Sequence, residues 1–438
     1  MELSAANPYL LLSPKGLPWS QVLAEPSARR RLYAIYLYFL HTDADETAKS
    51  MSKHLYTVYR KSDSNKDTLE DIWSVLLWEL KALASGFLPL AGEERKPLTE
   101  QRFGELLTGN HCFALMQVKG DWAWYVEALG LWQWNSKKWM CPFCRASRDG
   151  ELSWHDFSLR AQWLATCRNH TRFIEDMDLS RRNAFRRGDS PFAFETLLAK
   201  APFFSWSMVK LDWQHAFDLG TLSYELGEAL WSLLPSLALR ASAGSKRDRE
   251  TGLLEFKKRL RLHYKRERTD SRIPIRRFGL TKVKGKRHPK LKAKAVQTKR
   301  LLPFVANLAE ELRSADGALG EHRYQSLSYA RRICDLASRR ELTKQDMLDW
   351  RAWQALHMWH YIQCGFRIYP KFHYAMHLPS QVERGGVPRV FWVYSDEGKN
   401  AQIRTVFEIC SKGHSVYQQM LLRLDWLFEL KAIRVEMQ

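Results

Sequence analysis

The chain has 438 residues, of which 45% are hydrophobic and 26% charged, so it can bury the core of one large or two medium domains. A hydrophobic fraction this high excludes a wholly disordered chain. The formal net charge of +20 predicts attraction to polyanions such as DNA, RNA or anionic membranes.

The first elements in chain order predict an α/β domain. Two β-branched or aromatic runs at 31–41 and 54–60 favour neighbouring strands. A helix is expected from Thr68, which can cap it, to Gly86, which stops it. The apolar run 112–118 then predicts a buried strand that places Asp121 at its carboxyl end. Strand, strand, helix and strand in this order are typical of the α/β class.

Beyond about residue 190 the chain has mainly helical spacing. The apolar residues predict helices at 214–238, 251–266, 299–314, 322–339 and 343–363, then a strand at 389–394 and a helix at 398–430. The sheet is therefore expected to be interrupted by a long, mostly helical insertion. The expected organisation is an α/β part over 1–135, a zinc knuckle over 136–190, the insertion over 191–370 and a closing strand and helix over 371–438.

Cysteine usage and apolar run lengths bear on the compartment. The chain has seven cysteines, an odd number, and its start lacks the pattern of a secretory signal. The apolar run 32–40 is about half the roughly 20 residues that a membrane helix needs. We therefore expect an intracellular protein, nuclear if it binds DNA, with no membrane span.

Two pairs of metal-ligand type lie close together in the sequence. Cys141-Pro-Phe-Cys144 is followed by Cys167-Arg-Asn-His170, with His155 as a substitute ligand. Thiolates and an imidazole at this spacing can converge tetrahedrally on Zn²⁺ in a structural site. The alternative is that the cysteines are buried thiols and the histidine lies on the surface.

Three widely separated acids form the candidate catalytic set, namely Asp121, Asp212 and Glu397. Carboxylates at strand ends can hold Mg²⁺ ions that position a water or a DNA 3′ hydroxyl for attack on a phosphodiester. The alternative for each acid is a solvated surface residue or a helix cap.

Two histidine-containing pairs share a helix face. Asp212 and His215 are three residues apart, and His373 and His377 are four apart. Either pair could bind metal or position phosphate, and the alternative is hydrogen bonding within a structural core.

The segment 246–300 contains 22 Lys and Arg against 5 Asp and Glu, so it carries +17 of the net charge of +20. Neutralising phosphates with these cations would give salt-dependent, largely sequence-independent binding. The alternatives are a solvated basic linker, a nuclear-import signal or a helix that binds anionic lipid. The predicted nucleic-acid contacts are Lys257, Lys258, Arg259, Arg261, Lys265, Arg266, Arg276, Arg277, Lys284, Lys286, Arg287, Lys290, Lys292 and Lys294.

The order of several short motifs resembles transposon-encoded proteins related to CACTA (En/Spm-type) transposases. The motifs are GDWAWYVEALGL, WMCPFC, SWHDF, LDWQHAFDLG and PKFHYAMHLPSQVERGGVPRVFWVYSDEGKN, and the resemblance covers roughly residues 60–410. It implies an RNase H-like mixed sheet interrupted by an insertion, with two aspartates and a glutamate that bind Mg²⁺ for DDE-type strand cleavage and joining.

Matched by position, Asp121 resembles the second aspartate of that family. Asp212 and His215 match its Asp-x-x-His element, and Cys141 begins a CxxC that follows the second aspartate. His373 and His377 match the family's HxxxH element, and Glu397 matches the glutamate that follows it. The only apolar run before residue 31, at 8–12, is not followed by an acid, and Asp43 and Asp45 come after the next predicted strand instead. The first catalytic aspartate is therefore expected to be missing, along with the N-terminal part of the domain.

The sequence therefore predicts a transposon-derived DNA-binding protein with a degenerate transposase core. Whether it is an enzyme stays open, as do RNA as a partner and assembly into a homo-oligomer. The alternative function is a non-catalytic, zinc-containing nucleic-acid-binding or scaffold protein.

Overall fold

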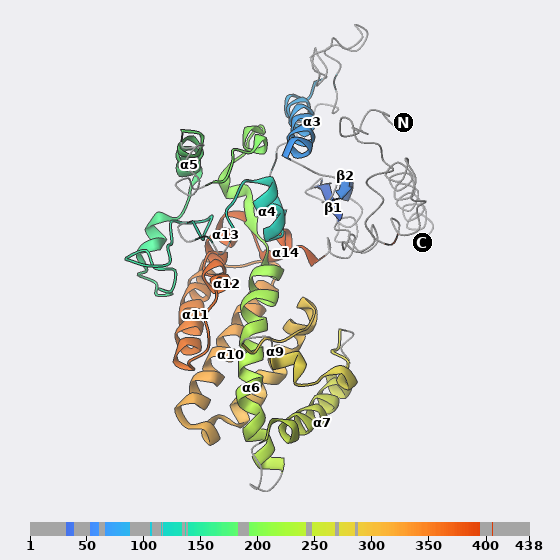
Figure 1. Ribbon diagram of the computed structural model, residues 1–438, viewed down its shortest axis with the longest axis vertical. Coiled ribbons are helices and arrows are strands. Elements are labelled where there is room, and N and C mark those ends of the chain that lie inside the picture. Colours follow the sequence, from blue (N-terminus) through green and yellow to red (C-terminus); the bar gives the residue numbers. More distant parts are fainter. Residues whose placement is uncertain are drawn as a thin grey trace. The chain divides into compact units, whose positions relative to one another are not determined.

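The computed structural model describes residues 32–38, 53–60, 66–87, 106, 115, 117–133, 136, 139–182, 192–241, 248–267, 271–284, 288–394 and 405 (Figure 1). The chain divides into two compact units. The first comprises Met1–Ala82, Phe87–Gly109 and Tyr394–Gln438, and the second comprises Leu83–Gly86 and Asn110–Val393. The sites described below lie in the second unit.

The first described elements follow the predicted order. Strands β1 (Leu32–Tyr38) and β2 (Lys53–Arg60) pair antiparallel, with an irregularity in register between Ile35 and Tyr36. Helix α3 (Lys66–Ser85) ends before Gly86, whose φ of 77° is a conformation that residues with a side chain rarely adopt. Both strands and the helix are confirmed.

The second unit contains a short parallel sheet, whose strands come before its long helices in the sequence. Strand β3 (Val118–Gly120) pairs with β4 (Val209–Leu211), and Gly120 lies opposite Leu211. Helix α4 (Trp122–Ala128) follows β3 directly. Strand β4 falls inside the segment predicted to be a helical insertion, so that prediction was wrong at this point. A segment of three residues, such as β4, is too short to show the alternation of apolar and polar residues that identifies a strand.

The rest of the second unit is helical in its described part. A π-helix covers Gln214–Thr221. The α-helices are α5 (His170–Arg182), α6 (Leu222–Ala241), α7 (Arg249–Glu267), α8 (Thr281–Lys284), α9 (Ala295–Glu311), α10 (Gly317–Ala337), α11 (Lys344–Gln363), α12 (Pro370–Ala375), α13 (Leu378–Gly385) and α14 (Pro388–Phe391). The five predicted helices are confirmed within a few residues. In the described part of the chain, none of the helices is long and apolar enough to cross a membrane.

The segment 389–394, predicted as a strand, was assigned wrongly. Its first residues belong to α14, because Pro388 at the first helical position has a backbone angle suited to a helix start. The helix predicted at 398–430 lies outside the described residues.

Helices α6, α9 and α10 build the core of the helical part. Leu226, Leu233 and Leu237 recur at helical spacing on α6 and are fully buried, as are Val305 on α9 and Ile333 on α10. Each such side chain contributes roughly 1.5–3 kcal/mol by leaving water. Helix α6 is thus the central helix against which its neighbours pack (Figure 1).

A buried polar network joins helices α6, α10 and α11. Glu225 of α6 accepts a hydrogen bond from the Ser326 hydroxyl of α10 at 2.6 Å, and its other oxygen lies 2.9 Å from Nε2 of His357 on α11. All three residues are buried. Because an unpaired buried carboxylate would be costly, this network fixes how α10 and α11 are positioned on α6.

Helix α7 approaches α6 so closely that only glycine fits at the contact. A Cβ atom at Gly252 would lie 1.9 Å from the carbonyl oxygen of Leu234. We expect Gly252→Ala to lower the free energy of unfolding by roughly 2 kcal/mol or more, because the two backbones must separate. Urea unfolding would measure this change, with Gly279→Ala as the control, since its nearest atom is 3.8 Å away. Equal stabilities of the two variants would contradict the close approach.

Candidate metal centre

Two cysteines in one loop, with two residues between them, form the first half of the site. Cys141 and Cys144 are 1% and 0% exposed. The backbone amide of Phe143 donates to Sγ of Cys141 at 3.4 Å, and that of Ala146 donates to Sγ of Cys144 at 3.4 Å. Amide donors aimed at sulfur stabilise the thiolate, which is the form that binds metal.

Two histidines one helical turn apart form the second half. His373 lies in α12 and His377 directly precedes α13, and both are buried. The Tyr374 hydroxyl, next to His373, donates to the Met140 carbonyl, and its ring stacks on Trp122 at 4.7 Å. These contacts hold α12 against the loop that carries the cysteines.

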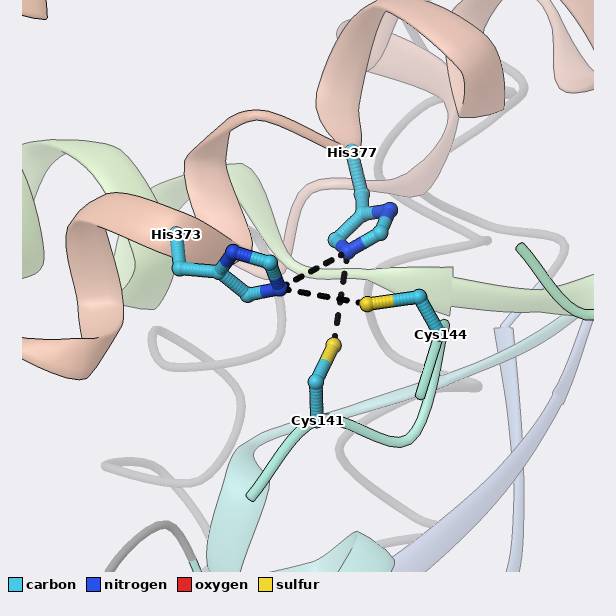
Figure 2. Close-up of side chains that lie close together, drawn as sticks. All are labelled: Cys141, Cys144, His373 and His377. Atoms are coloured by element: carbon cyan, nitrogen blue, oxygen red, sulfur yellow. Dashed lines mark hydrogen bonds between the residues drawn. The ribbon is translucent and has the colours of Figure 1, made fainter. Parts of the chain in front are cut away.

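The four side chains converge on one point from opposite sides (Figure 2). Nε2 of His377 lies 3.3 Å from Sγ of Cys141, and Nε2 of His373 lies 3.3 Å from Sγ of Cys144. The two Nε2 atoms are 3.3 Å apart, and the four ligand atoms all lie within 4.8 Å of one another. A tetrahedral Zn²⁺ would need sulfur–nitrogen and nitrogen–nitrogen separations of roughly 3.6 and 3.3 Å. The arrangement therefore fits a metal ion such as zinc.

The thiols and imidazoles of the cluster influence one another's protonation. Burial opposes ionisation of the Cys141 thiol, yet the Cys144 hydrogen bond and the nearby histidines together hold its pKa well below the ordinary value. Burial raises the pKa of Cys144 well above the ordinary value, and ionised Cys141 adds to that rise. Although burial opposes it, the charge and hydrogen bond of Cys141 raise the pKa of His377 to about 10, so thiolate and imidazolium form an ion pair whose proton a divalent cation would replace.

Aromatic and ionic contacts surround the centre. The Trp163 ring meets His373 and His377 edge-on, at centroid distances of 4.5 and 5.1 Å. Arg168, itself buried, donates to the carbonyls of Cys141 and Pro142 and pairs with buried Asp176 at 2.6 Å. These neighbours pack against the ligands and the loop that carries them, as the surroundings of a structural metal site should.

The partners predicted for the two cysteines need correction. His170 is exposed at the start of α5, and exposed His155 packs on Trp154. Neither joins the cluster, because His170 begins a helix whose buried face carries other residues, such as Phe173. Cys167 lies beside the cluster, with its Sγ 3.8 Å from Nδ1 of His377. The pair that meets the cysteines is His373 and His377, for which the sequence left three possibilities open: metal binding, phosphate positioning or hydrogen bonding within the core.

Cys167 lies where it can orient His377 rather than bind the metal itself. Its sulfur faces Nδ1, whereas Nε2 of His377 points into the cluster. We expect Cys167→Ala to weaken zinc binding by about 10- to 100-fold, the usual cost of losing a group that orients a ligand. A competition titration with a chelator would measure it. Complete loss of zinc would instead identify Cys167 as a ligand.

Two of the predicted catalytic acids directly follow the two strands of the parallel sheet, at the same end. Asp121 directly follows β3 and caps α4 by accepting from the Trp124 amide at 2.7 Å. Asp212 directly follows β4 and is 2% exposed. It accepts from the Val393 amide at 3.0 Å, and its other oxygen lies 2.5 Å from Nδ1 of His215. Glu397 lies outside the described residues.

A lysine lies in the field of both carboxylates. Burial, followed by the charge of Lys290, lowers the pKa of Lys371 to about 8, while Asp212 and Asp121 act in the opposite direction. The Lys371 ammonium also donates to the His215 carbonyl at 3.3 Å. Sequence reasoning missed Lys371, because a lysine next to an HxxxH motif has no spacing that marks it.

Most of the predicted nucleic-acid contacts lie on the surface. Lys257 and Arg259 are half-buried, Arg259 pairs with Glu255 and Glu311, and Lys290 packs over the Tyr224 ring. Two of the fourteen, Lys286 and Arg287, lie outside the described residues. The exposed ones are Lys258, Arg261, Lys265, Arg266, Arg276, Arg277, Lys284, Lys292 and Lys294.

The geometry defines a protein with a buried Cys2His2 centre that could hold zinc. The sequence matches no protein-family model and no curated protein. The function of the protein must therefore be inferred from its own residues and their arrangement.

Proposed function

We propose that the protein is a transposon-derived DNA-binding protein, with a zinc-held core similar to that of CACTA transposases. Zinc would be the structural metal of the Cys2His2 centre, because four buried protein ligands leave no position for a substrate. Binding to DNA would place the protein in the nucleus.

The observation that carries this proposal is the convergence of two motifs from distant parts of the chain. The CxxC at Cys141 and the HxxxH at His373 are 229 or more residues apart and meet in one cluster. Both motifs belong to the resemblance, which rests on their order in the sequence alone. That they meet in space supports the resemblance, because unrelated short motifs would seldom combine into a tetrahedral ligand set.

The surface of α7 supports DNA as the partner. Lys258, Arg261 and Lys265 recur at spacings of three and four and are exposed, so they line one face of the helix. The chain that follows carries further exposed cations, namely Arg276, Arg277, Lys284, Lys292 and Lys294. A row of exposed cations suits a regular row of phosphates, and contacts to phosphates position a protein on a duplex without reading its sequence.

Fluorescence anisotropy with a labelled duplex of unrelated sequence would test the proposal. We expect binding that weakens by several orders of magnitude between about 50 and 200 mM salt, since each phosphate contact releases counterions. Parallel titrations with single-stranded DNA and with duplex RNA would show which class of nucleic acid the protein prefers. Absence of binding at about 50 mM salt would contradict the proposal.

A second function, metal-dependent phosphodiester cleavage, is favoured by the parallel register. Since Gly120 lies opposite Leu211, Asp121 and Asp212 leave the sheet at the same end. Carboxylates placed in this way suit Mg²⁺ and would belong to an RNase H-like fold.

Plasmid cleavage with Mg²⁺ or with EDTA would test this second function. Cleavage that requires Mg²⁺ and is lost in both Asp121→Asn and Asp212→Asn would support it. DNA binding without any cleavage would leave the non-catalytic alternative, a zinc-containing binding or scaffold protein.

A further inference from the structure

Two histidines meet across the contact between α10 and α11, which lie side by side (Figure 1). Nδ1 of His322 on α10 lies 3.0 Å from Nδ1 of His360 on α11. Both residues are half-buried. They belong to different helices from the four ligands of the Cys2His2 centre, and no function described above uses them.

Aromatic contacts hold both imidazoles in place. The Trp359 ring meets His322 and His360 edge-on, at centroid distances of 5.2 and 4.6 Å, and Tyr329 stacks on His360 at 5.8 Å. Trp359 is 50% exposed, so water reaches this side of the pair. The rings are therefore oriented in advance and open to solutes.

The distance between the two nitrogens suits one metal ion. Two histidine nitrogens that bind the same tetrahedral ion at about 2.0–2.1 Å are roughly 3.3 Å apart, close to the 3.0 Å seen here. Two protonated nitrogens would repel one another at this distance, so at least one presents a lone pair. Burial and neighbouring His322 also lower the pKa of His360, which keeps that ring neutral at neutral pH.

We propose that His322 and His360 form a second, exchangeable transition-metal site, with water molecules completing the coordination of Ni²⁺, Cu²⁺ or Zn²⁺. Imidazole nitrogen suits these three ions, whereas Mg²⁺ and Ca²⁺ prefer oxygen. The ion would replace the proton that the two nitrogens share and would link α10 to α11. A site with only two protein ligands releases its ion far more readily than the four-ligand centre.

Nickel titration of the zinc-loaded protein tests the site, because Ni²⁺ is the probe least drawn to the thiolates. Isothermal titration calorimetry should show one equivalent of bound Ni²⁺. His322→Asn and His360→Asn should each weaken that binding by at least tenfold, about 1.4 kcal/mol. His170→Asn, which removes an exposed histidine elsewhere, should leave it unchanged. Zinc content and circular dichroism would verify that each variant folds.

A second readout uses the tryptophan beside the pair and needs no ligand to be removed. Bound Ni²⁺ should quench the Trp359 fluorescence, so Trp359→Phe should show less quenching than the wild-type protein when both are saturated with Ni²⁺. The proposal is overturned by a wild-type protein that binds no additional Ni²⁺, or by equal binding in the His322, His360 and His170 variants. Quenching that is unaltered in Trp359→Phe would place the ion elsewhere and overturn it as well.

Discussion

Cys144→Ser should remove zinc from the Cys2His2 centre and unfold the part of the chain around it. Structural zinc contributes apparent binding free energies of about 10–16 kcal/mol in zinc-finger peptides, comparable to the whole stability of a domain. Without the ion, the remaining buried thiol and two buried imidazoles would lose their common partner. The zinc content, measured by mass spectrometry, should fall from about one ion per chain to near zero. The Tm should fall strongly as well.

Cys364→Ser is the matched control for this loss. Cys364 is half-buried at the carboxyl end of α11, and burial raises the pKa of its thiol to about 12, so it stays protonated. Its replacement should leave the zinc content at the wild-type value. If Cys144→Ser retained both zinc and Tm, the cluster would be a set of hydrogen-bonded core residues instead of a metal centre.

Replacing Lys258, Arg261 and Lys265 together by glutamine should strongly weaken DNA binding. Each cation that no longer neutralises a phosphate lowers the salt dependence, the slope of log K against log salt, by about 0.9. Removing three cations should therefore reduce the slope by about 2.7 and the affinity at low salt by roughly tenfold or more. Anisotropy titrations over a series of salt concentrations measure both quantities.

The control removes the same charge from another surface. Arg331, Arg340 and Lys344 are also exposed, on or beside α10 and α11. Their replacement by glutamine should change the slope much less, although the net charge falls equally. Equal effects of the two triple variants would mean that overall charge attracts DNA and that α7 is not the contact surface.

Local patterns in the sequence were sufficient for the long helices of the described part, such as α6 and α10. The stretch around Leu226 and Leu233 predicts α6, since its apolar residues recur every three or four positions and are buried together. Strands were harder to predict where they were short. Val209–Leu211 has only three residues, and its pairing with Val118–Gly120 depends on a distant segment.

The metal centre shows a different limit of sequence reasoning. Cys141 and Cys144 were identified from their spacing, which is a local property. Their predicted partners were Cys167 and His170, the next pair of metal-ligand type along the chain, although the fold brings His373 and His377 instead. A ligand pair can be recognised within one turn of chain, but the choice of its partner is decided by how the helices and the short sheet pack.

The separation between the two halves of the centre also has a consequence for biosynthesis. At about 5–20 residues per second, a ribosome would need roughly 10–50 s after making Cys144 to reach His373, 229 residues later. During that time the nascent chain presents two thiols without their imidazole partners. The complete ligand set exists only once nearly all of the second unit has been made, so metal capture would be a late step that locks an almost finished domain.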